Sequence, residues 1–398
     1  MKTSDLYHSK YDCCGCELCS QSCPKGIITM VPDEAGFLYP VINNESLCIN
    51  CKRCFNVCPM KTPGREGKTV IKSFSFSLKD TEDLKKSASG GLATEISRRF
   101  VKEGGIVYGV AYSEDYLYIH YRRATTLVDL EKFRGSKYVQ ATKTNLYALI
   151  KKDLKEGKQV LFIGLPCEVS AVYHAVGDKD GLYSISLICH GPTSQKVHRD
   201  YCKNISLSPD NKITFMSVRY KRSGWKPYFI HVDYEDGKEY NEQFNKSDYN
   251  TAFLYMKRLS CRNCHYKAGD KRFGLSADLI AGDFHGVNPS SVQYNKWGVS
   301  QGSILTKKGE YLASLLEKEY KLQEIPYEVI RTTNRAMYVS IPQRGNFNRF
   351  VNDYNKRSLH FACNSSMVKI TNLFVELSFL LKRIINITKK IKGLFRYL

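Results

Sequence analysis

The sequence has no long apolar run and few acidic side chains. Its longest apolar run, Leu377 to Leu381, is interrupted by Ser378 and falls far short of the ~18 residues that a membrane-spanning helix requires. The segment from Met1 to Tyr11 contains no apolar stretch of the kind that secretory signals carry. Helix-turn-helix, zinc-finger and RNP motifs are also missing. These absences predict a cytoplasmic protein that does not bind nucleic acid.

The shortage of acidic residues is confined to one part of the chain. The 398 residues include 60 Lys and Arg but 39 Asp and Glu, a net charge of +21. Residues 1–66 hold seven of each sign, so the whole excess lies in residues 67–398. A basic body favours an anionic partner, such as an acidic redox protein, a phosphorylated cofactor or substrate, or an anionic membrane face. The length and the 42% apolar content allow two or three globular domains.

Cysteine is abundant and is concentrated in two runs of the same spacing. The runs from Cys13 and from Cys48 both follow C-x2-C-x2-C-x3-C-P, the spacing by which bacterial-type ferredoxins hold 4Fe–4S clusters. This stretch resembles two-cluster ferredoxins, in which the fourth cysteine of each run binds the partner cluster, and Cys14 is left over. The alternatives are structural zinc and disulfides, which need different spacing or an oxidising compartment. The expected ligand sets are Cys13, Cys16, Cys19 and Cys58, and Cys48, Cys51, Cys54 and Cys23.

After a linker rich in breakers at residues 61–67, the pattern predicts alternating strands and helices. This alternation favours an α/β core with functional residues at the carboxyl ends of the strands. From Ile213 onward the pattern becomes antiparallel, with Asp236-Gly237 as a hairpin turn. The expected strands are 71–78, 105–111, 116–122, 159–163, 182–188, 213–220 and 228–234, and the expected helices are 92–103, 144–155 and 249–259.

Four more cysteines occupy positions that suit a further metal site. Cys167 and Cys189 each follow a predicted strand, and Cys261 and Cys264 form a C-x2-C pair. Four such thiolates would complete a third cluster or a zinc site, and the spacing does not choose between the two. In the simplest alternative, Cys167 and Cys189 are small buried apolar residues.

Five short motifs follow one another in the order found in a known family. The region from about residue 70 to 335 resembles the coenzyme F420 hydrogenase/dehydrogenase beta-subunit family. The resemblance implies an iron–sulfur flavoprotein oxidoreductase that binds FAD and moves electrons between clusters and a two-electron partner. The motifs are Ser89-Gly90-Gly91, Phe133 to Gln140, Gly164 to Glu168, Cys189 to Ser194, and Cys261-x2-Cys264 leading to Ala277-Asp278 and Gly282-Asp283-Phe.

The resemblance also implies a cofactor role for individual residues. Ser89, Gly90 and Gly91 match the stretch that receives the FAD phosphates, where the amides of a helix N-terminus attract an anion. A plain turn with a serine cap is the alternative. Asp278 and Asp283 would orient flavin or ribityl hydroxyls, or else cap a strand.

A second implied group combines the catalytic candidates with the cluster ligands. Gly135, Ser136, Lys137 and Tyr138 match a cofactor-proximal segment, in which Lys137 would place its charge on phosphate or flavin. Read alone, Lys137 is a surface lysine. His190 would contact flavin or substrate, although a hydrogen-bonded loop histidine is the simpler alternative. The ligands implied for the cluster beside the flavin are Cys167, Cys189, Cys261 and Cys264.

The chain departs from the family pattern at a few positions. Leu165 and Glu168 replace the usual threonine and glutamine, the basic residue that often follows is absent, and His285 replaces a tryptophan. These positions lie where a nicotinamide-like or deazaflavin partner would approach. The resemblance therefore does not carry F420 itself over as the substrate.

The C-terminal segment has its own pattern. Apolar residues recur at helical spacing from Ile370 to Leu394, with basic residues among and after them. This pattern predicts a basic amphipathic helix that binds an anionic membrane surface or packs on the body or on a partner subunit. The basic residues are Lys382, Arg383, Lys389, Lys390, Lys392 and Arg396.

We therefore expect a multidomain α+β protein in three parts. Residues 1–66 would form a dicluster ferredoxin fold, residues 67–340 a mixed α/β domain for FAD and iron–sulfur, and residues 341–398 the tail. The expected function is an oxidoreductase relay between 4Fe–4S clusters and FAD, acting on a small two-electron substrate that is F420-like or belongs to polysaccharide synthesis. Electrons would enter or leave at the N-terminal domain through an acidic carrier or partner subunit. The alternatives are a non-catalytic electron-transfer subunit and a redox sensor.

Overall fold

Four parallel strands form the middle of the main sheet in the computed structural model, which describes residues 1–206 and 211–394, with side chains to residue 381. The sheet has eight strands in the order β13-β3-β12-β11-β7-β6-β4-β5, and β4, β6, β7 and β11 run parallel. The strands are β3 (Lys72–Phe76), β4 (Ile106–Tyr112), β5 (Ile119–Ala124), β6 (Val160–Gly164), β7 (Leu182–Leu187), β11 (Leu279–Asp283), β12 (Ser300–Ile304) and β13 (Gln323–Glu324). The prediction of an α/β core is confirmed.

Helices cover both faces of this sheet because alternate strand residues point to opposite sides. In β6, Val160 and Phe162 pack with α7 (Leu146–Lys155) and α8 (Pro166–Val176), whereas Leu161 packs with α5 (Leu92–Lys102) on the other face. The apolar residues of α5 recur every fourth position and are buried there. The remaining helices of this region are α4 (Thr81–Lys85), α6 (Leu127–Glu131), α11 (Lys307–Glu317), α12 (Tyr327–Thr333) and α13 (Arg335–Tyr338).

A second, antiparallel sheet joins the body through two helices. Its strands are ordered β10-β9-β8, and Gly237 adopts φ +79° in the expected hairpin turn between β9 and β10. The helices α9 and α10 pack against each other and share the core of this sheet. The elements are α9 (Gln195–Ile205), β8 (Ile213–Tyr220), β9 (Phe229–Tyr234), β10 (Glu239–Gln243) and α10 (Asp248–Tyr255).

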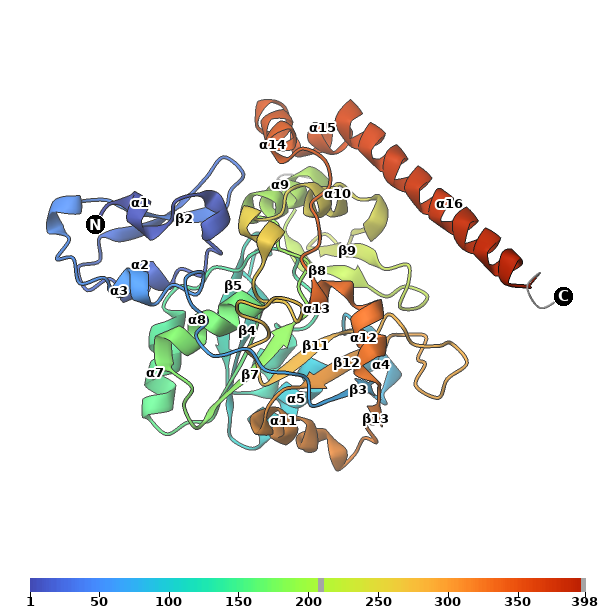
Figure 1. Ribbon diagram of the computed structural model, residues 1–398, viewed down its shortest axis with the longest axis horizontal. Helices are drawn as coiled ribbons and strands as arrows, with labels where there is room; N and C mark the ends of the chain where they lie inside the picture. Colours follow the sequence, from blue (N-terminus) through green and yellow to red (C-terminus); the bar gives the residue numbers. More distant parts are fainter. Residues whose placement is uncertain (207–210, 395–398) are drawn as a thin grey trace.

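The N-terminal unit is small and sits at one side of the body (Figure 1). It contains one antiparallel strand pair, in which Ile28 faces Ile42. The expected linker at residues 61–67 is fixed to the body, because the Gly64 amide donates to the Ser170 hydroxyl at 2.8 Å and Arg65 pairs with the buried Asp278 at 2.7 Å. The elements are α1 (Thr3–Leu6), α2 (Leu18–Ser22), β1 (Ile28–Pro32), β2 (Leu38–Ile42) and α3 (Arg53–Asn56).

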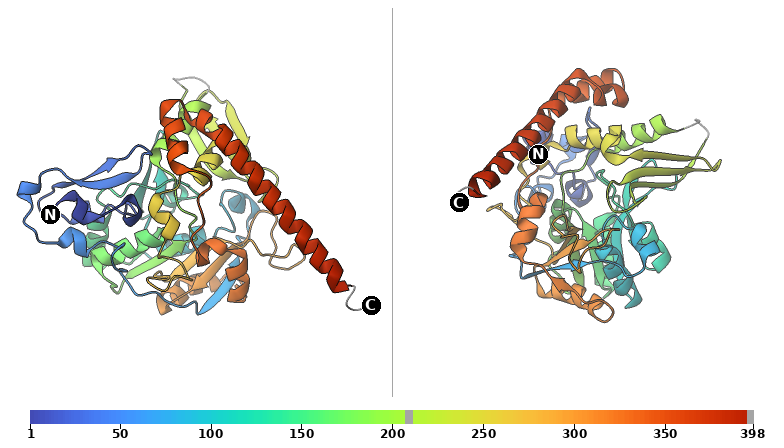
Figure 2. Two further views of the ribbon diagram at one scale, coloured as in Figure 1. Left: turned by 45° about the horizontal axis from the view of Figure 1, so that its top comes forward. Right: turned by 90° about the vertical axis from the view of Figure 1, so that its right-hand side faces the viewer.

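The predicted C-terminal tail divides into two parts. The helices α14 (Phe347–Lys356) and α15 (Leu359–Cys363) pack on the body with their apolar residues in its core. Only α16 (Ser366–Leu394) leaves the body, as Figures 1 and 2 show. In the described part of the chain, no helix combines the length and apolarity needed to cross a bilayer. The basic residues predicted beyond position 381 lie outside the described side chains.

Candidate iron–sulfur and cofactor site

One cavity, here called the thiol cavity, collects the cysteines of the body. It lies where β6 and β7 end, because parallel strands bring their carboxyl ends to one edge of the sheet. Cys167 lies in the first turn of α8, and Cys189 comes two residues after β7. Cys261 and Cys264 come from the 3-10 helix η4 (Leu259–Asn263) and the residue after it. All four line the cavity, and so does Cys14 of the N-terminal unit.

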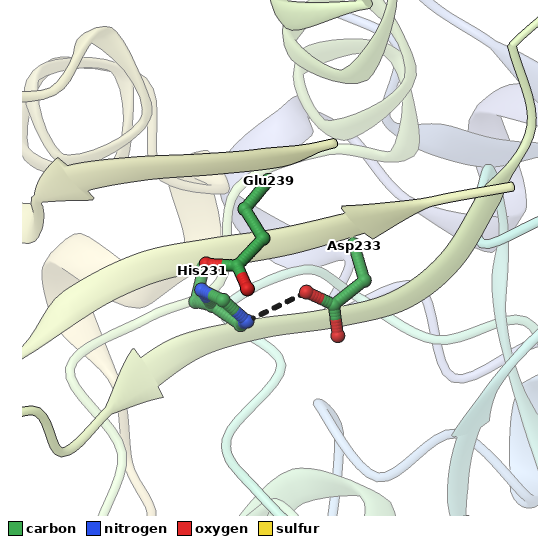
Figure 3. A group of neighbouring side chains, drawn as sticks. All are labelled: His231, Asp233 and Glu239. Carbon is green, nitrogen blue, oxygen red and sulfur yellow. Dashed lines mark ion pairs between the residues drawn. The ribbon is translucent and has the colours of Figure 1, made fainter. Parts of the chain in front are cut away.

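Among the described residues, the only three or more His, Cys, Asp or Glu ligands that lie within 4.8 Å of one another are His231, Asp233 and Glu239 (Figure 3). Four sulfurs on tetrahedral zinc lie about 3.8 Å apart, because each Zn–S bond is about 2.3 Å long. No three thiols of the thiol cavity are gathered to that distance in the described chain.

The group in Figure 3 is a hydrogen-bonded histidine on the antiparallel sheet. The Nε2 atom of His231 lies 2.8 Å from the Asp233 carboxylate, and its Nδ1 atom lies 2.8 Å from the Asn241 amide oxygen. The ring also stacks on Tyr220. Both ring nitrogens are engaged, so this group is not assigned a metal.

Three buried cations surround the thiol cavity. Lys257, Arg258 and Lys267 are 2%, 1% and 5% exposed. The charged nitrogens of Lys257 and Lys267 reach only backbone carbonyls, at 3.5 Å and at 2.6–2.7 Å. No carboxylate of the described side chains lies within 4.0 Å of any of the three. Because a buried charge is costly unless it is paired, these cations require an anion, and the cysteine sulfurs are the groups beside them.

The N-terminal unit brings its eight predicted ligands together in the two expected groups. Burial, and then the nearby Cys16, Cys13 and Cys58, raise the pKa of the Cys19 thiol. Burial raises the pKa of Cys54 in the same way, followed by its own neighbours. Those neighbours are Cys23, Cys51 and Cys48. Together with Cys54 they line a second cavity.

The two cysteine loops differ in what surrounds them. The inner loop, residues 13–19, is held by the body: Gln140 donates to the Cys14 carbonyl and Tyr147 to the Cys16 carbonyl, both at 2.6 Å. The outer loop, residues 48–54, carries the exposed Cys51. The cavity of the outer loop shares no lining residue with the thiol cavity. The inner loop is therefore the one that joins the two halves of the molecule.

A buried ion pair reinforces the inner loop. Lys143 and Glu168 lie 2.8 Å apart with side chains that are 0% and 3% exposed. Glu168 also accepts from the Tyr121 hydroxyl and follows Cys167 directly in the chain. The Lys143 amide donates to Glu17 of the inner loop. Glu168, a departure from the family pattern, is thus part of the contact between the N-terminal unit and the body.

Several predicted cofactor residues gather around one arginine at the carboxyl end of β11. Arg219 donates to the Tyr138 hydroxyl and to Asp283, both at 3.0 Å, and to the Ala88 carbonyl beside Ser89. Burial disfavours the charged form of Asp283, but Arg219 lowers the pKa of this carboxyl below its usual value. Lys221, which is 4% exposed, donates to the Ser89 carbonyl at 2.7 Å. Burial lowers the pKa of Lys221 to about 7.

The glycines of the Ser89 turn are needed for its close packing. A Cβ on Gly90 would lie 2.1 Å from the Phe76 carbonyl oxygen, and Gly91 adopts φ +85° as it opens α5. The turn is therefore pressed against strands β3 and β12. Trp225 donates to the Ala88 carbonyl, and its ring lies parallel to that of His285 at 6.1 Å. The Trp225 indole therefore lies beside His285, the position at which the family pattern has a tryptophan.

The structure places the two catalytic candidates in different surroundings. His190 is an exposed residue that lines the thiol cavity, and partial desolvation there, followed by Lys257 and Lys267, lowers the pKa of its imidazole. The Lys137 ammonium donates to the Lys132 and Arg134 carbonyls at 3.1 and 2.8 Å. Burial lowers the pKa of Lys137 to about 7. Gly135 and Ser136 lie in the same loop, partly exposed.

Asp278 lies at the opposite end of β11 from Asp283, away from the group around Arg219, as in the strand-cap alternative. It precedes β11, whereas Asp283 ends it. Its fully buried carboxylate accepts from Arg65, Thr306 and the Ser184 amide at 2.7, 2.7 and 2.9 Å. Asp278 therefore anchors the end of the N-terminal unit to the sheet.

Sequence reasoning missed the charged residues that line the two sites. Lys257 and Arg258 closely precede the C-x2-C pair, which is a signal that could have suggested a counter-charge for thiolates. Cys14 lines the thiol cavity although it belongs to the N-terminal unit, and the only sequence signal for this is its position beside Cys13. Arg219 and Lys221 alternate with their neighbours at the end of one strand, and the sequence gives no sign that their side chains are buried.

Comparisons with known proteins agree with this division of the chain. Residues 12–62 match the family model described as 4Fe-4S dicluster domain, and residues 157–328 match the model for the C terminus of the coenzyme F420 hydrogenase/dehydrogenase beta subunit. No curated protein matches the chain. A chain in the solved F420-reducing NiFe hydrogenase complex from Methanosarcina barkeri is similar, with 20% identity, 68% of this chain and 89% of that chain covered, and a TM-score of 0.47. The protein thus joins a 4Fe–4S dicluster domain to a domain of the coenzyme F420 hydrogenase/dehydrogenase beta-subunit family.

Proposed function

We propose that the protein is an oxidoreductase with three 4Fe–4S clusters and FAD, acting on a two-electron substrate. The observation that carries this proposal is the thiol cavity, which is lined by the buried cations Arg258 and Lys267 and has the buried Lys257 beside it, all without a carboxylate partner among the described side chains. A cluster held by four thiolates is an anion and would supply the missing counter-charge. The ligands would be Cys167, Cys189, Cys261 and Cys264 in the cavity, with the inner and outer sets of the N-terminal unit for the other two clusters.

The cofactors would supply complementary chemistry, since clusters carry single electrons whereas a flavin also exchanges a hydride. The chain's own residues would hold these groups in fixed positions and keep water away. His190 would be neutral at pH 7 beside the thiol cavity, because partial desolvation and two nearby lysines lower its pKa. A neutral imidazole at this position could accept or donate a hydrogen bond to a substrate. A substrate of the F420 type or a polysaccharide precursor would approach here.

The flavin proposal depends on the group around Arg219. Arg219 and Lys221 are buried close to the Ser89 turn, and Lys221 has no carboxylate within ion-pair distance among the described side chains. The Nε atom of Arg219 is buried without a hydrogen-bond partner. Two cations beside the N-terminus of α5 would suit an anionic phosphate. Trp225 and His285 would supply the flat aromatic surface that a flavin ring packs against.

The clusters can be tested on anaerobically prepared protein. We expect Cys189→Ser and Cys261→Ser to lower the iron and sulfide content by about one third, since each removes a ligand from one of three clusters. Cys202→Ser and Cys363→Ser are matched controls, because these cysteines are buried in the core away from the thiol cavity. Unchanged iron in the first pair would contradict a cluster in the cavity. If the purified protein contains iron and flavin but does not turn over a hydride donor, the alternative of a non-catalytic electron-transfer subunit would be favoured.

The flavin site makes a prediction about pH. Lys221 is charged only below about pH 7 in the free protein, and a bound phosphate would raise its pKa. Binding would then take up a proton, so FAD affinity should be highest below pH 7 and fall as the pH rises above it. Lys221→Met should remove this dependence, whereas Arg222→Met, the exposed neighbour, should keep it. A pH-independent affinity in the unaltered protein, measured by flavin fluorescence, would contradict the assignment.

The outer loop is proposed as the docking site of an acidic electron carrier or partner subunit. Leu47, Ile49 and Phe55 are 55%, 58% and 41% exposed around the outer cysteines. Lys52 and Arg53 are exposed beside them. Apolar side chains within a basic rim suit a weak, charge-steered encounter of the kind made by redox proteins.

The helix α16 is proposed to bind an anionic membrane surface. Its exposed apolar side chains include Leu373, Phe374 and Leu380, and the sequence after residue 381 adds six basic residues. The full chain should sediment with vesicles containing phosphatidylserine and not with phosphatidylcholine vesicles, and a chain ending at Ser365 should bind neither. Equal binding to both vesicles, or self-association in place of binding, would contradict the proposal.

A further inference from the structure

Arg258 is a deeply enclosed cation between the inner loop and the thiol cavity. Its side chain is 1% exposed, and every nitrogen of the guanidinium has an acceptor. The Nε atom donates to the Cys13 carbonyl at 2.7 Å, one terminal nitrogen to Gln140 at 2.9 Å, and the other to the Leu38 carbonyl at 2.9 Å. These bonds fix the position of the charge.

The guanidinium contacts one ligand of the inner set and lines the cavity that holds the other set. Its second terminal nitrogen lies 3.4 Å from the Cys13 sulfur, which belongs to the inner set. Arg258 also lines the thiol cavity, and the charge of Cys261 acts on it there. No carboxylate of the described side chains lies within 4.0 Å of it. Among the described side chains, the charges that act on Arg258 come mainly from thiols of both sets and from Tyr39, and Arg258 in turn acts on Glu17 of the inner loop.

The inner loop is shaped around this side chain. Gly15 adopts φ +66°, and a Cβ at this position would lie 2.5 Å from an Arg258 nitrogen. The neighbouring Cys14 interacts with the thiols of both Cys16 and Cys167. Cys14 thus lies between a ligand of the inner set and a ligand of the thiol cavity. The inner loop approaches the cavity closely, and Arg258 occupies the point of approach.

We propose that Arg258 is a shared counter-charge that raises the reduction potentials of the inner cluster and the thiol-cavity cluster together. The inference rests on the proposed function, because it requires a cluster in the cavity. Each cluster gains one negative charge when it takes up one electron, and a fixed positive charge beside both stabilises each reduced form. Arg258 acts through the clusters' surroundings and is a positioning residue, with no contact to substrate.

The test is a redox titration followed by electron paramagnetic resonance on the full, cluster-loaded protein. We expect Arg258→Gln, which keeps hydrogen-bond donors but loses the charge, to weaken reduction of both clusters at least tenfold, about 59 mV for a one-electron couple. Arg258→Lys should restore most of both potentials. Arg331→Gln is the matched control, because Arg331 is exposed on α12, pairs with Glu328 and lines neither cysteine cavity. It should shift neither potential.

Each other outcome overturns the proposal. A shift of the inner potential alone would show that the charge is not shared, and no shift in either would show that Arg258 only fills space. If Arg258→Gln fails to fold, Arg258→Lys decides the question. Lysine keeps the positive charge, so a tenfold weakening of reduction in Arg258→Lys would show that charge does not set the potentials. Iron content separates the two levels: unaltered protein with iron for only two clusters overturns both the proposed function and this inference, whereas three clusters with an unmoved potential overturn this inference alone.

Discussion

The inner and outer loops of the N-terminal unit share one cysteine spacing but have opposite surroundings. Cys14, Cys16 and Leu18 of the inner loop are 5%, 7% and 2% exposed, whereas Ile49 in the outer loop is 58% exposed. The body donates hydrogen bonds to three successive carbonyls of the inner loop, those of Cys14, Gly15 and Cys16. The spacing of the cysteines determines which metal core each loop would hold. Under the proposed function, these surroundings would let the inner loop exchange electrons with the body and the outer loop with an external protein.

The largest expected difference concerns removal of one ligand from each loop. Cys16→Ser should slow electron transfer between the N-terminal unit and the body by about 100-fold or more. Loss of a residue that only supports a metal ligand already lowers metal affinity or activity by about 10–100-fold, and loss of a ligand should cost at least as much. Cys51→Ser should block a protein donor but leave reduction by a small dye that reaches the body. Stopped-flow reduction of the flavin measures both. Equal loss with the dye in the two variants would mean that the loops are not functionally distinct.

A second prediction concerns stability. Lys143→Met should destabilise the protein by about 3–5 kcal/mol, because it leaves Glu168 buried without its partner. Lys52→Met, a charge loss in the exposed outer loop, should change the free energy of unfolding by no more than about 0.5 kcal/mol. Urea denaturation of the reconstituted protein is the measurement. The double variant Lys143→Met with Glu168→Leu should recover most of the loss, and a failure to recover would contradict the ion-pair explanation.

A smaller effect is expected at the rim of the outer loop. Reversing the charges of Lys52 and Arg53 to Glu should slow association with an acidic carrier roughly tenfold at low ionic strength and reduce its salt dependence. The folded state and the iron content should stay unchanged, because both side chains are exposed. Lys212→Glu, an exposed change beside the antiparallel sheet, is the control. A salt-independent rate in the unaltered protein would argue against charge steering.

The smallest effect is expected for the one cysteine of the inner loop outside both ligand sets. Cys14→Ser should leave iron and sulfide unchanged, and it should change stability by about 1 kcal/mol. Iron analysis beside Cys16→Ser provides the comparison. Loss of a cluster in Cys14→Ser would mean that Cys14 is itself a ligand and that one of the four cavity thiols is not.

Sequence patterns predicted the strands β3 to β9 and the dicluster motif, because both depend on local spacing. The apolar run of β6 and the α5 helix lie within one or two residues of their expected positions. The patterns could not distinguish roles that depend on distant contacts. Asp278 and Asp283 look alike as residues flanking one strand, yet they lie at its opposite ends.

The charges of the site show the same limit. Arg258 and Lys267 read as ordinary basic residues near a C-x2-C pair, and only the packing of the N-terminal unit and of residues 189–192 encloses them. The packing of the first part of the predicted C-terminal tail could not be read from the sequence for a related reason. The apolar residues of α14 and α15 resemble those of a separate helix, but they complete the core beside α9 and α10.

The attachment of residues 64 and 65 to the body, at the end of the sheet where β11 begins, has a mechanical consequence. Arg65 is held by Asp178 and Asp278 at 3.0 and 2.7 Å, so the chain that leaves the N-terminal unit is anchored at once and cannot act as a swinging arm. Many carriers ferry electrons by moving a tethered domain between two docking places. Here the N-terminal unit is fixed to the body, so an electron-transfer partner would have to diffuse to it.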